Sequence, residues 1–382
     1  MNVQFNPTNL KIARLAHDFS IAELGESVGK SRQYLARLEA GVDIPSISMS
    51  DLLAEQLDVT PDFFYNAAGR RLEDSAFHFR KLASTKTADK LGAIAKVEIF
   101  SRFFDAIEKR LSLPKYDFPS IECNTAEEIE RSAEKCRTHW GLGLGPISNC
   151  VRLMENAGAV VTSFNSNQSI DALSILSARP IVVINKSESA CRVRFDHGHE
   201  CGHFVMHFGK STGDQATESE ANRFSSALLL PRSTFAREFP SVRGRSQINW
   251  KAIIELKFRW KTSKSAILYR AKQLSLISDS TYKHALISGL YGRGQRKIED
   301  EDKDIPVEKA ELLPNSLEAL RTNFGITAPV LAREINIGQR MLRKILPDDF
   351  FTIDIPKSYE TSNVVLGNFS RERSFDRNTC RV

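Results

Sequence analysis

Two histidines and a glutamate at positions 199–203 form the constellation in this chain that is best suited to chemistry. The five residues read HECGH, which is the pattern HExxH. On a helix, residues four apart lie on one face, so the imidazoles of His199 and His203 can bind a single Zn²⁺. Glu200 projects near the same edge, where it can accept a proton from the water that attacks a substrate. The pattern therefore predicts a zinc-dependent hydrolytic site.

A catalytic zinc site needs a third protein ligand and one open position. The segment ESEANRF at 218–224 offers two carboxylates, and an apolar run follows it. Glu218 and Asn222 are four apart on a helix that could pack against the first, so Glu218 would bind zinc and Asn222 could hold a ligand histidine through its other ring nitrogen. Glu220 is the rival ligand, and it sits about 200° round the helix from Glu218, so only one of them can face the metal.

Several alternatives stay open around this motif. Two histidines at helical spacing also occur as a surface or core pair without a metal. His207 lies on the same face as His203, and it is either a further polar group of the site or a side chain that packs at the helix end, which we favour. Tyr282, His207 and Asn222 are unranked candidates for an oxyanion donor. A metzincin site is excluded, because glycine occupies position 209, where that class has its third histidine.

Helices must carry most of these residues. We expect a helix over 195–207 and another over 218–230 that stops at Pro231. Two apolar runs predict short strands, and four further segments predict helices around the core. The strands are expected at 159–164 and 181–185, and the helices within 125–158 (two), over 250–274 and over 279–291.

Residues 8–66 predict a series of short helices separated by turns. Ser20 and Glu23 have the spacing of a capping box, and Gly29 follows the next helix as a stop signal. A further helix spans 31–40 and ends at Gly41. Two helices joined by a glycine-containing turn are typical of the helix-turn-helix motif.

Composition and charge set the limits for the function. The chain has 382 residues, enough for two or three domains, and no run of eighteen apolar residues or secretory signal is present. We therefore expect a cytoplasmic protein without a membrane partner. The six cysteines form no CxxC pair, which favours reduced thiols that pack in the interior. They are Cys123, Cys136, Cys150, Cys191, Cys201 and Cys380.

The distribution of charge says more than the net charge of +6. Residues 1–68 have five basic and nine acidic side chains, whereas residues 69–115 have eleven basic and six acidic ones. An acidic domain binds a polyanion weakly, because phosphate contacts supply most of the affinity. The basic connector that follows could restore such contacts, or it could be a solvated helix face. Its candidate contact residues are Arg70, Arg71, Arg80 and Lys81.

The remaining C-terminal part is less informative. The charged run at 297–309 is typical of a solvated linker. Residues 316–346 predict a helical group with the rhythm of a helix-turn-helix or winged-helix pair, although a small lid or docking domain fits equally well. Residues 352–382 show no regular pattern.

The block from about 126 to 290 resembles the ImmA/IrrE family of zinc metallopeptidases. The resemblance implies a gluzincin-like site with His199, His203 and Glu218 as zinc ligands and Glu200 as general base, and family members cleave a repressor or antitoxin. Cys201 and Gly198 depart from the usual residues around the motif, but neither is a ligand. The matching stretches are WGLGLGPISN (140–149), IDALSI (170–175), RPIVVIN (179–185), RVRFDHGHECGHFVMH (192–207), ESEANRFSSALLLP (218–231) and SKSAILYRAKQLSLIS (263–278).

Residues 10–65 resemble the Cro/repressor-like (XRE) helix-turn-helix family, with IAELGESVGKSRQYLARLEAGVDIPSI at 21–47 as the matching core. The resemblance implies that the second helix of the motif enters the major groove and that homodimers form on DNA. The glutamine usual near the start of the first motif helix is absent, and Ile21 and Ala22 stand there. The residues that would face DNA are Ser31, Arg32, Gln33, Tyr34 and Arg37.

Together these observations predict an α+β, mainly helical protein with a five-helix N-terminal domain and a gluzincin-like domain that carries a small antiparallel sheet. The expected parts are a helix-turn-helix domain (1–68), the basic connector (69–115), the peptidase domain (116–292) and a linker with a small helical domain (293–382). The expected function is a zinc endopeptidase that cuts a repressor or antitoxin in a transcriptional switch. The alternatives are a DNA-binding regulator or antitoxin whose zinc domain binds a partner without proteolysis, and the toxic partner of a mobile-element or phage-defence toxin–antitoxin pair.

Overall fold

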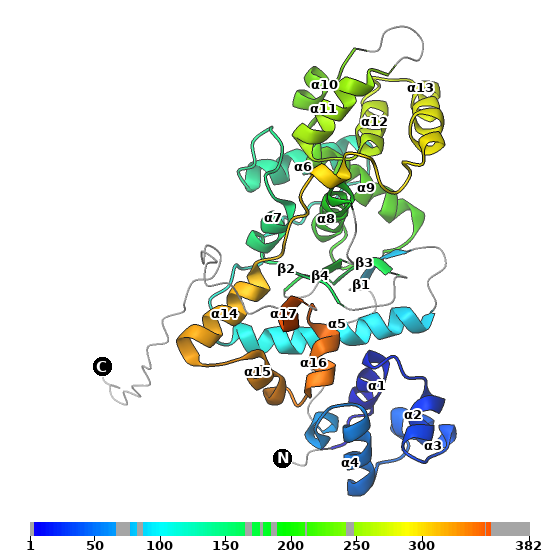
Figure 1. Cartoon of the computed structure of the whole chain (residues 1–382), viewed down its shortest axis with the longest axis vertical. Helices are drawn as coiled ribbons and strands as arrows, with labels where there is room; N and C mark the ends of the chain where they lie inside the picture. Colours follow the sequence, from blue (N-terminus) through cyan, green and yellow to red (C-terminus); the bar gives the residue numbers. More distant parts are fainter. Residues whose placement is uncertain are drawn as a thin grey trace, which may run out of the picture.

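A small sheet lies between two helical layers in the computed structural model of this chain (Figure 1). The structure describes residues 4–65, 77–81, 87–164, 170–175, 179–184, 189–210, 212–241, 248–347 and 349–352. The expected irregular segment 352–382 lies outside this range except for its first residue. Arg70, Arg71 and Asn185 lie outside it as well, and so do the side chains of Arg80 and Lys81.

The N-terminal domain has the five helices expected from the sequence, the last of them a short 3-10 helix. Ser20 and Glu23 form the predicted capping box, and Ser31 and Ser46 cap the next two helices. Gly29 supplies the positive φ of the turn between the two motif helices. The helices are α1 (Pro7–Ala16), α2 (Ile21–Ser27), α3 (Arg32–Glu39), α4 (Ile47–Gln56) and η1 (Pro61–Phe64).

The four-stranded sheet has the order β1-β3-β4-β2. The pairs β1–β3 and β3–β4 are antiparallel, but β2 and β4 are parallel, so the sheet is mixed and not purely antiparallel as expected. The two predicted strands are β2 and β4, whereas β1 and β3 were not predicted as strands. The strands are β1 (Phe77–Lys81), β2 (Val160–Thr162), β3 (Ile170–Ile175) and β4 (Ile181–Ile184).

Alternation along the strands divides the interior into two hydrophobic cores. On β4, Ile181 and Val183 belong to the core formed with α5 and the N-terminal domain, while Val182 and Ile184 belong to the core formed with α8 and α9. Leu173 and Ile175 on β3 also face the first core. Ser174 between them therefore faces the opposite side, toward α8.

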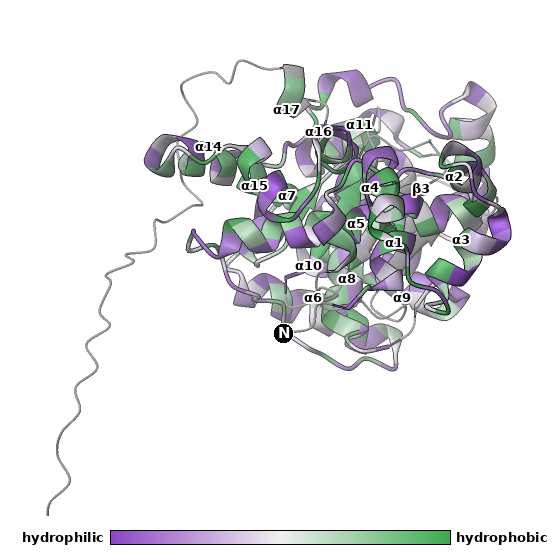
Figure 2. Cartoon of the chain, turned by 90° about the horizontal axis from the view of Figure 1, so that it is seen from below, coloured by the Kyte–Doolittle hydropathy of each residue, from purple (hydrophilic) through white to green (hydrophobic). Residues whose placement is uncertain are grey.

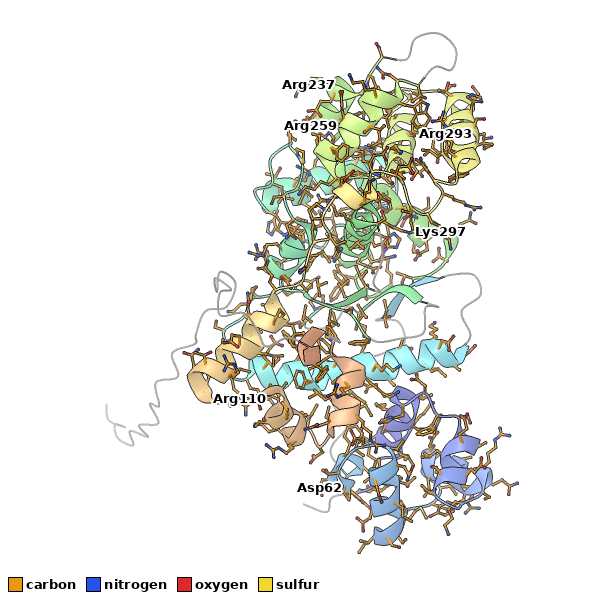
Figure 3. All side chains as sticks on the ribbon, viewed as in Figure 1. Asp62, Arg110, Arg237, Arg259, Arg293 and Lys297 are labelled. Carbon is orange, nitrogen blue, oxygen red and sulfur yellow. The ribbon has the colours of Figure 1, made fainter. Side chains whose placement is uncertain are left out.

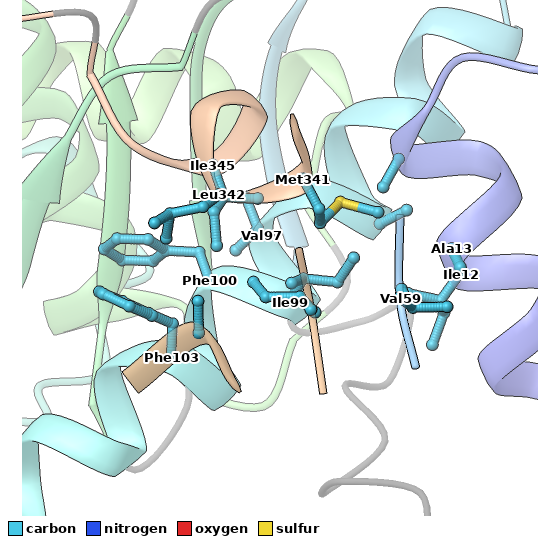
Figure 4. Packing of buried hydrophobic residues seen from close by; sticks show 14 of the residues in the cluster. Ile12, Ala13, Val59, Val97, Ile99, Phe100, Phe103, Met341, Leu342 and Ile345 are labelled. Carbon is cyan, nitrogen blue, oxygen red and sulfur yellow. The ribbon is translucent and has the colours of Figure 1, made fainter. Parts of the chain in front are cut away.

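Helix α5 (Thr87–Glu108) covers the first face of the sheet. It lies within the basic range 69–115, but its apolar side is buried, with Val97, Phe100 and Phe103 fully inaccessible. The ring of Phe100 lies 5.7 Å from that of Phe164, which follows β2. Figure 4 shows Val97, Phe100 and Phe103 beside Met341, Leu342 and Ile345 of α16. The segment called a connector is thus a central element of the fold.

The second layer contains the helices that carry the predicted site. The expected long helix over 250–274 is two helices, because Lys261 adopts a left-handed conformation at φ 50° and ends the first. A short π-helical segment (Ala285–Leu290) extends the last. The helices are α6 (Ala126–His139), α7 (Cys150–Asn156), α8 (Ala190–Met206), α9 (Gln215–Leu229), α10 (Arg232–Glu238), α11 (Trp250–Trp260), α12 (Lys264–Gln273) and α13 (Asp279–His284).

The expectation of a solvated linker at 297–309 is wrong for Glu299 and Asp302, although Asp300 and Asp304 are exposed as expected. Glu299 and Asp302 are buried, and each accepts a hydrogen bond of 2.6 Å from the fully buried Lys257. Burial alone would lower the pKa of Lys257, but the carboxylates of Asp302 and Glu299 raise it. The segment is therefore fastened to α11 by charge pairs that composition cannot reveal.

The C-terminal helices join the N-terminal domain to α5. Val59 and Ile337 form an isolated β-bridge, and Gly338 N donates to Asp58 O at 2.7 Å. Arg110 at the end of α5 pairs with Glu334 at 2.9 Å (Arg110 is labelled in Figure 3). These helices are α14 (Leu312–Phe324), α15 (Ala328–Glu334), α16 (Gln339–Ile345) and α17 (Asp349–Thr352).

Hydrophobic residues are concentrated inside the molecule. Figure 2 shows them along α5, while hydrophilic residues lie on outer helices such as α15. Within the described residues, no helix is long and apolar enough to cross a membrane. The five cysteines in that range are buried free thiols, as their spacing predicted.

The carboxylate of Asp58 caps α16 from the N-terminal domain, and its removal tests this junction. Asp58 Oδ2 accepts from Met341 N at 2.8 Å, and Asp58 has a φ of 49°. We expect Asp58→Ala to lower the local free energy of opening of α16 by about 1–2 kcal/mol, since it loses the cap and strains the backbone. Native-state hydrogen exchange of the α16 amides measures this value. Asp58→Asn keeps a capping oxygen and tolerates positive φ, so it should remain close to the wild type; equal protection in all three proteins would contradict the capping role.

Candidate metal centre

The site depends on an unusually close approach of α8 and α9. Two glycines on α8, Gly198 and Gly202, face Ser225 and Ala221 of α9. A Cβ on Gly198 would lie 2.5 Å from Ser225 Oγ, and one on Gly202 would lie 3.2 Å from Ala221 Cα. Ser225 Oγ also donates to the carbonyl oxygen of Phe195 at 2.7 Å. Small residues four apart on both helices thus let the two backbones meet, which brings the acidic start of α9 to the histidines of α8.

Three side chains meet there in a triangle of ligand atoms. His199 Nε2 lies 3.0 Å from His203 Nε2. Glu218 Oε2 lies 3.3 Å from His199 Nε2, and Glu218 Oε1 lies 3.4 Å from His203 Nε2. Around a tetrahedral zinc with bonds of about 2.0–2.1 Å, neighbouring ligand atoms stand about 3.3–3.4 Å apart. The triangle has this size, and these residues are the group within the described chain whose atoms could together hold a metal ion.

The Nδ1 atoms of His199 and His203 point away from the triangle, and their hydrogen-bond partners indicate which ring nitrogen carries the proton. His199 Nδ1 lies 3.0 Å from Asn222 Oδ1, an acceptor, so Nδ1 carries the proton. His203 Nδ1 lies 2.9 Å from His207 Nδ1, and His207 Nε2 lies 2.9 Å from Glu220 Oε2. With Nδ1 protonated, both Nε2 atoms direct lone pairs at each other and at a carboxylate. That arrangement repels itself unless a cation sits between the three groups.

Burial and neighbouring side chains also act on the titratable groups of the site. Burial alone would raise the pKa of Glu218, but its contacts with His199 and His203 hold that pKa well below its ordinary value. Burial lowers the pKa of His207, and its hydrogen bond with Glu220 opposes this shift. The histidine rings are almost inaccessible, whereas the Glu218 side chain is 26% exposed. The site is therefore open to solvent on the Glu218 side, as a catalytic metal requires.

Glu200 is buried beside the ligands, at 1% exposure. Ser174 Oγ on β3 donates a hydrogen bond to Glu200 Oε2. Glu200 Oε1 has no hydrogen-bond partner among the described residues. A buried carboxylate with one anchored and one unpaired oxygen is suited to accept a proton from a substrate molecule.

The structure brings together most of the residues singled out by sequence. Glu218 and not Glu220 faces the two histidines, and Asn222 reaches His199 as expected for a supporting residue. The favoured interpretation of His207 was incomplete: it ends α8, but it also bridges His203 and Glu220. The ring of Tyr282 contacts Tyr269 and Lys272 instead.

Ser174 was missed by sequence reasoning. It lies in the stretch IDALSI, which the family resemblance had marked without a role. The alternation of Leu173 and Ile175 around it was the available signal, since a single serine between two buried aliphatic residues faces the other side of the strand. Recognising it required β3 to be identified as a strand first.

The candidate DNA-facing residues lie on or beside α3. Arg32 and Gln33 are exposed, while Tyr34 is partly buried with Lys30 over its ring. Ser31 is the N-cap, and its Oγ accepts from Tyr34 N at 3.2 Å. Arg37 makes two hydrogen bonds of 2.7 Å to Asp43. Arg32 and Gln33 are thus free to reach bases, whereas Ser31 and Arg37 already have partners in the domain.

Comparison with protein families matches both parts of the chain. Residues 154–272 match Peptidase_M78, described as the IrrE N-terminal-like domain, and residues 10–64 match a helix-turn-helix model, HTH_3. The chain therefore joins an XRE-type helix-turn-helix domain to an IrrE/ImmA-like domain of the metallopeptidase type. A comparison with curated proteins gave no match.

Removal of single ligands tests the metal centre. We expect about one metal ion per chain in the wild type and loss of it in His199→Ala and Glu218→Ala, because two remaining ligands bind far more weakly. Elemental analysis of the purified proteins measures the content. His139→Ala is the matched control, since His139 also pairs with a carboxylate, Asp117, at 2.7 Å but lies on α6. Metal content that is unaffected by the two ligand substitutions would refute the site.

Proposed function

We propose that this protein is a zinc-dependent endopeptidase that cleaves a regulatory partner, such as a repressor or an antitoxin-like protein, in the cytoplasm. The observation that carries the proposal is the triangle of His199, His203 and Glu218 with a buried Glu200 next to it. A purely structural zinc site is closed by four protein ligands and has no need of such a glutamate. The switch in which it acts, whether a transcriptional circuit, a toxin–antitoxin pair or phage defence, follows from the identity of that partner.

The residues divide the work of peptide hydrolysis. When bound, zinc would polarise the scissile carbonyl and make the attacking water more acidic. Glu200 Oε1 accepts the proton of that water and then delivers it to the leaving amine. Ser174 holds the other oxygen of Glu200, so the carboxylate keeps one orientation. Asn222 and His207 fix the histidine rings.

Glu200→Gln separates metal binding from hydrolysis. The amide keeps the size of the side chain and can still accept from Ser174, but it cannot take a proton at neutral pH. We expect full metal content and a loss of cleavage of at least about 100-fold. Mapping of new protein N-termini in cells that express the wild type or the variant measures cleavage of any protein substrate in the cell. Identical sets of N-termini in both cells would exclude proteolysis by this site.

We further propose that the N-terminal domain binds DNA through α3. Arg32 and Gln33 are exposed at the start of this helix, and arginine reads guanine while glutamine reads adenine. Lys30 and Arg37 add local positive charge, and the hydroxyl groups of Ser31 and Tyr34 would contact the DNA backbone. Binding as a homodimer would appear as two half-sites about one helical turn apart.

Selection from a random duplex library tests this second activity. We expect the wild type to enrich one sequence. The double substitution of Arg32→Ala and Gln33→Ala should weaken binding to that sequence by about 1–3 kcal/mol for each bidentate base contact that is lost. Arg333→Ala removes an exposed arginine on α15 and serves as the control. Affinities at two salt concentrations separate base contacts from phosphate contacts. Lack of any enriched sequence would assign the domain to a protein partner.

That outcome would favour the second candidate function, a regulator that holds a partner without cutting it. The observation behind it is a set of exposed apolar side chains beside α3, in an N-terminal domain with more acidic than basic residues. Val42, Ile44 and Ile47 are 64%, 68% and 83% exposed. Such a surface suits a protein better than phosphate groups. The set of new N-termini in the Glu200→Gln experiment decides between the two functions.

A further inference from the structure

His207 is a buried histidine whose two ring nitrogens are both engaged. It ends α8 four residues after His203, and only 2% of it is exposed. Its Nδ1 lies 2.9 Å from His203 Nδ1, and its Nε2 lies 2.9 Å from Glu220 Oε2. The Glu220 side chain is 34% exposed, so the contacts run from the metal triangle toward the surface.

With an ionised carboxylate on Glu220 and a neutral ring on His207, the contacts assign the protons along this path. An ionised carboxylate only accepts hydrogen bonds, so His207 Nε2 must donate to Glu220. A neutral imidazole has one N–H, so His207 Nδ1 is left as an acceptor. His203 Nδ1 then donates to it, and His203 Nε2 keeps its lone pair for the triangle. The opposite tautomer of His203 would place a proton at the metal position and two acceptors face to face at 2.9 Å.

We propose that His207 and Glu220 are positioning residues that fix the tautomer and orientation of His203 for metal binding. The inference rests on the metal site of the proposed function, but it concerns metal affinity and does not require cleavage. His199 is supported directly by the neutral amide of Asn222. The chain of hydrogen bonds from His203 through His207 to Glu220, here called the relay, ends on a negative charge. Outer partners of this kind raise the basicity of a ligand histidine, and a charged one does so more strongly than an amide.

Helix α9 therefore contributes three side chains to the site within five residues. Glu218 gives the third ligand, Asn222 supports His199, and Glu220 supports His203 through His207. Glu220, which was the rival ligand by sequence, acts on the metal position through His207 and His203. The close contact of α8 and α9 positions all three of these side chains together.

Zinc affinity of the full chain, measured by competition with a chromophoric chelator, tests the relay. His207→Leu removes both hydrogen bonds, and we expect it to weaken zinc binding by about 10- to 100-fold. His207→Gln should restore affinity to within about threefold, because an amide can accept from His203 and donate to Glu220. Since a purely space-filling role would favour leucine over glutamine, this rescue distinguishes positioning from packing. Equal affinity of His207→Leu and the wild type would overturn the inference.

His197→Leu is the matched control for loss of a buried histidine on the same helix. His197 is also 2% exposed, but its Nδ1 contacts the carbonyl oxygen of Val193 and its Nε2 has no partner among the described residues. We expect its zinc affinity to equal that of the wild type. A loss as large as that of His207→Leu would mean that α8 had been disturbed in general, and it would refute the specific relay.

Glu220 provides a test that does not depend on a buried substitution. Glu220→Leu removes the outer acceptor at a partly exposed position, and we expect about a tenfold loss of zinc affinity, with Glu220→Gln between it and the wild type. Wild-type affinity in Glu220→Leu would contradict the relay. These experiments measure zinc affinity and not cleavage, so the relay and the peptidase function can be refuted separately. A wild type that binds zinc but cleaves no protein would refute only the proposed function.

Discussion

The close packing of α8 against α9 is the contact on which the rest of the site depends. Two glycines and two small residues, each pair four apart, allow it. A methyl group on Gly198 would have to displace Ser225, and the acidic start of α9 would move away from the histidines with it. HExxH alone aligns two candidate ligands on one helix face, but the third, Glu218, comes from the other helix, as do Asn222 and Glu220. The glycines within the motif region are therefore as necessary to the geometry as the histidines.

The sheet holds the carboxylate of Glu200 through Ser174, and it also links the two ends of the chain. Because side chains alternate along β3, Ser174 meets Glu200 on one face, while Leu173 and Ile175 join the core of α5 on the other. The same core contains residues of the N-terminal domain and of the C-terminal helices. The N-terminal domain thus shares a core with α5 and one face of the sheet, while α8 and α9 share a second core with the opposite face.

The parts that sequence predicted are those set by local spacing. The capping box at Ser20, the helix stop at Gly29 and the face shared by His199 and His203 all depend on residues within four positions of one another, where helical geometry decides the outcome. What it missed depends on partners far along the chain. Ser174 and Glu200 are 26 residues apart, and Lys257 and Asp302 are 45 apart. Such contacts arise only when the elements have packed, so a charged run looks like a linker until its buried partner is known.

The charge of the N-terminal domain shows the same difference between composition and structure. Counted alone, residues 1–68 have four more acidic than basic side chains, which argues against DNA binding. Yet Asp18 pairs with Lys96 and Lys344. Asp58 lies 3.5 Å from Arg340 Nε. Both aspartates lie on the side of the domain that faces α5 and α16. Cations from outside the domain therefore offset most of its excess negative charge, and they do so away from α3. The field near α3 is set by Lys30, Arg32 and Arg37, while the acids Glu39 and Asp43 are paired with Arg14 and Arg37. An acidic count over a sequence range thus does not make the surface that would meet DNA acidic.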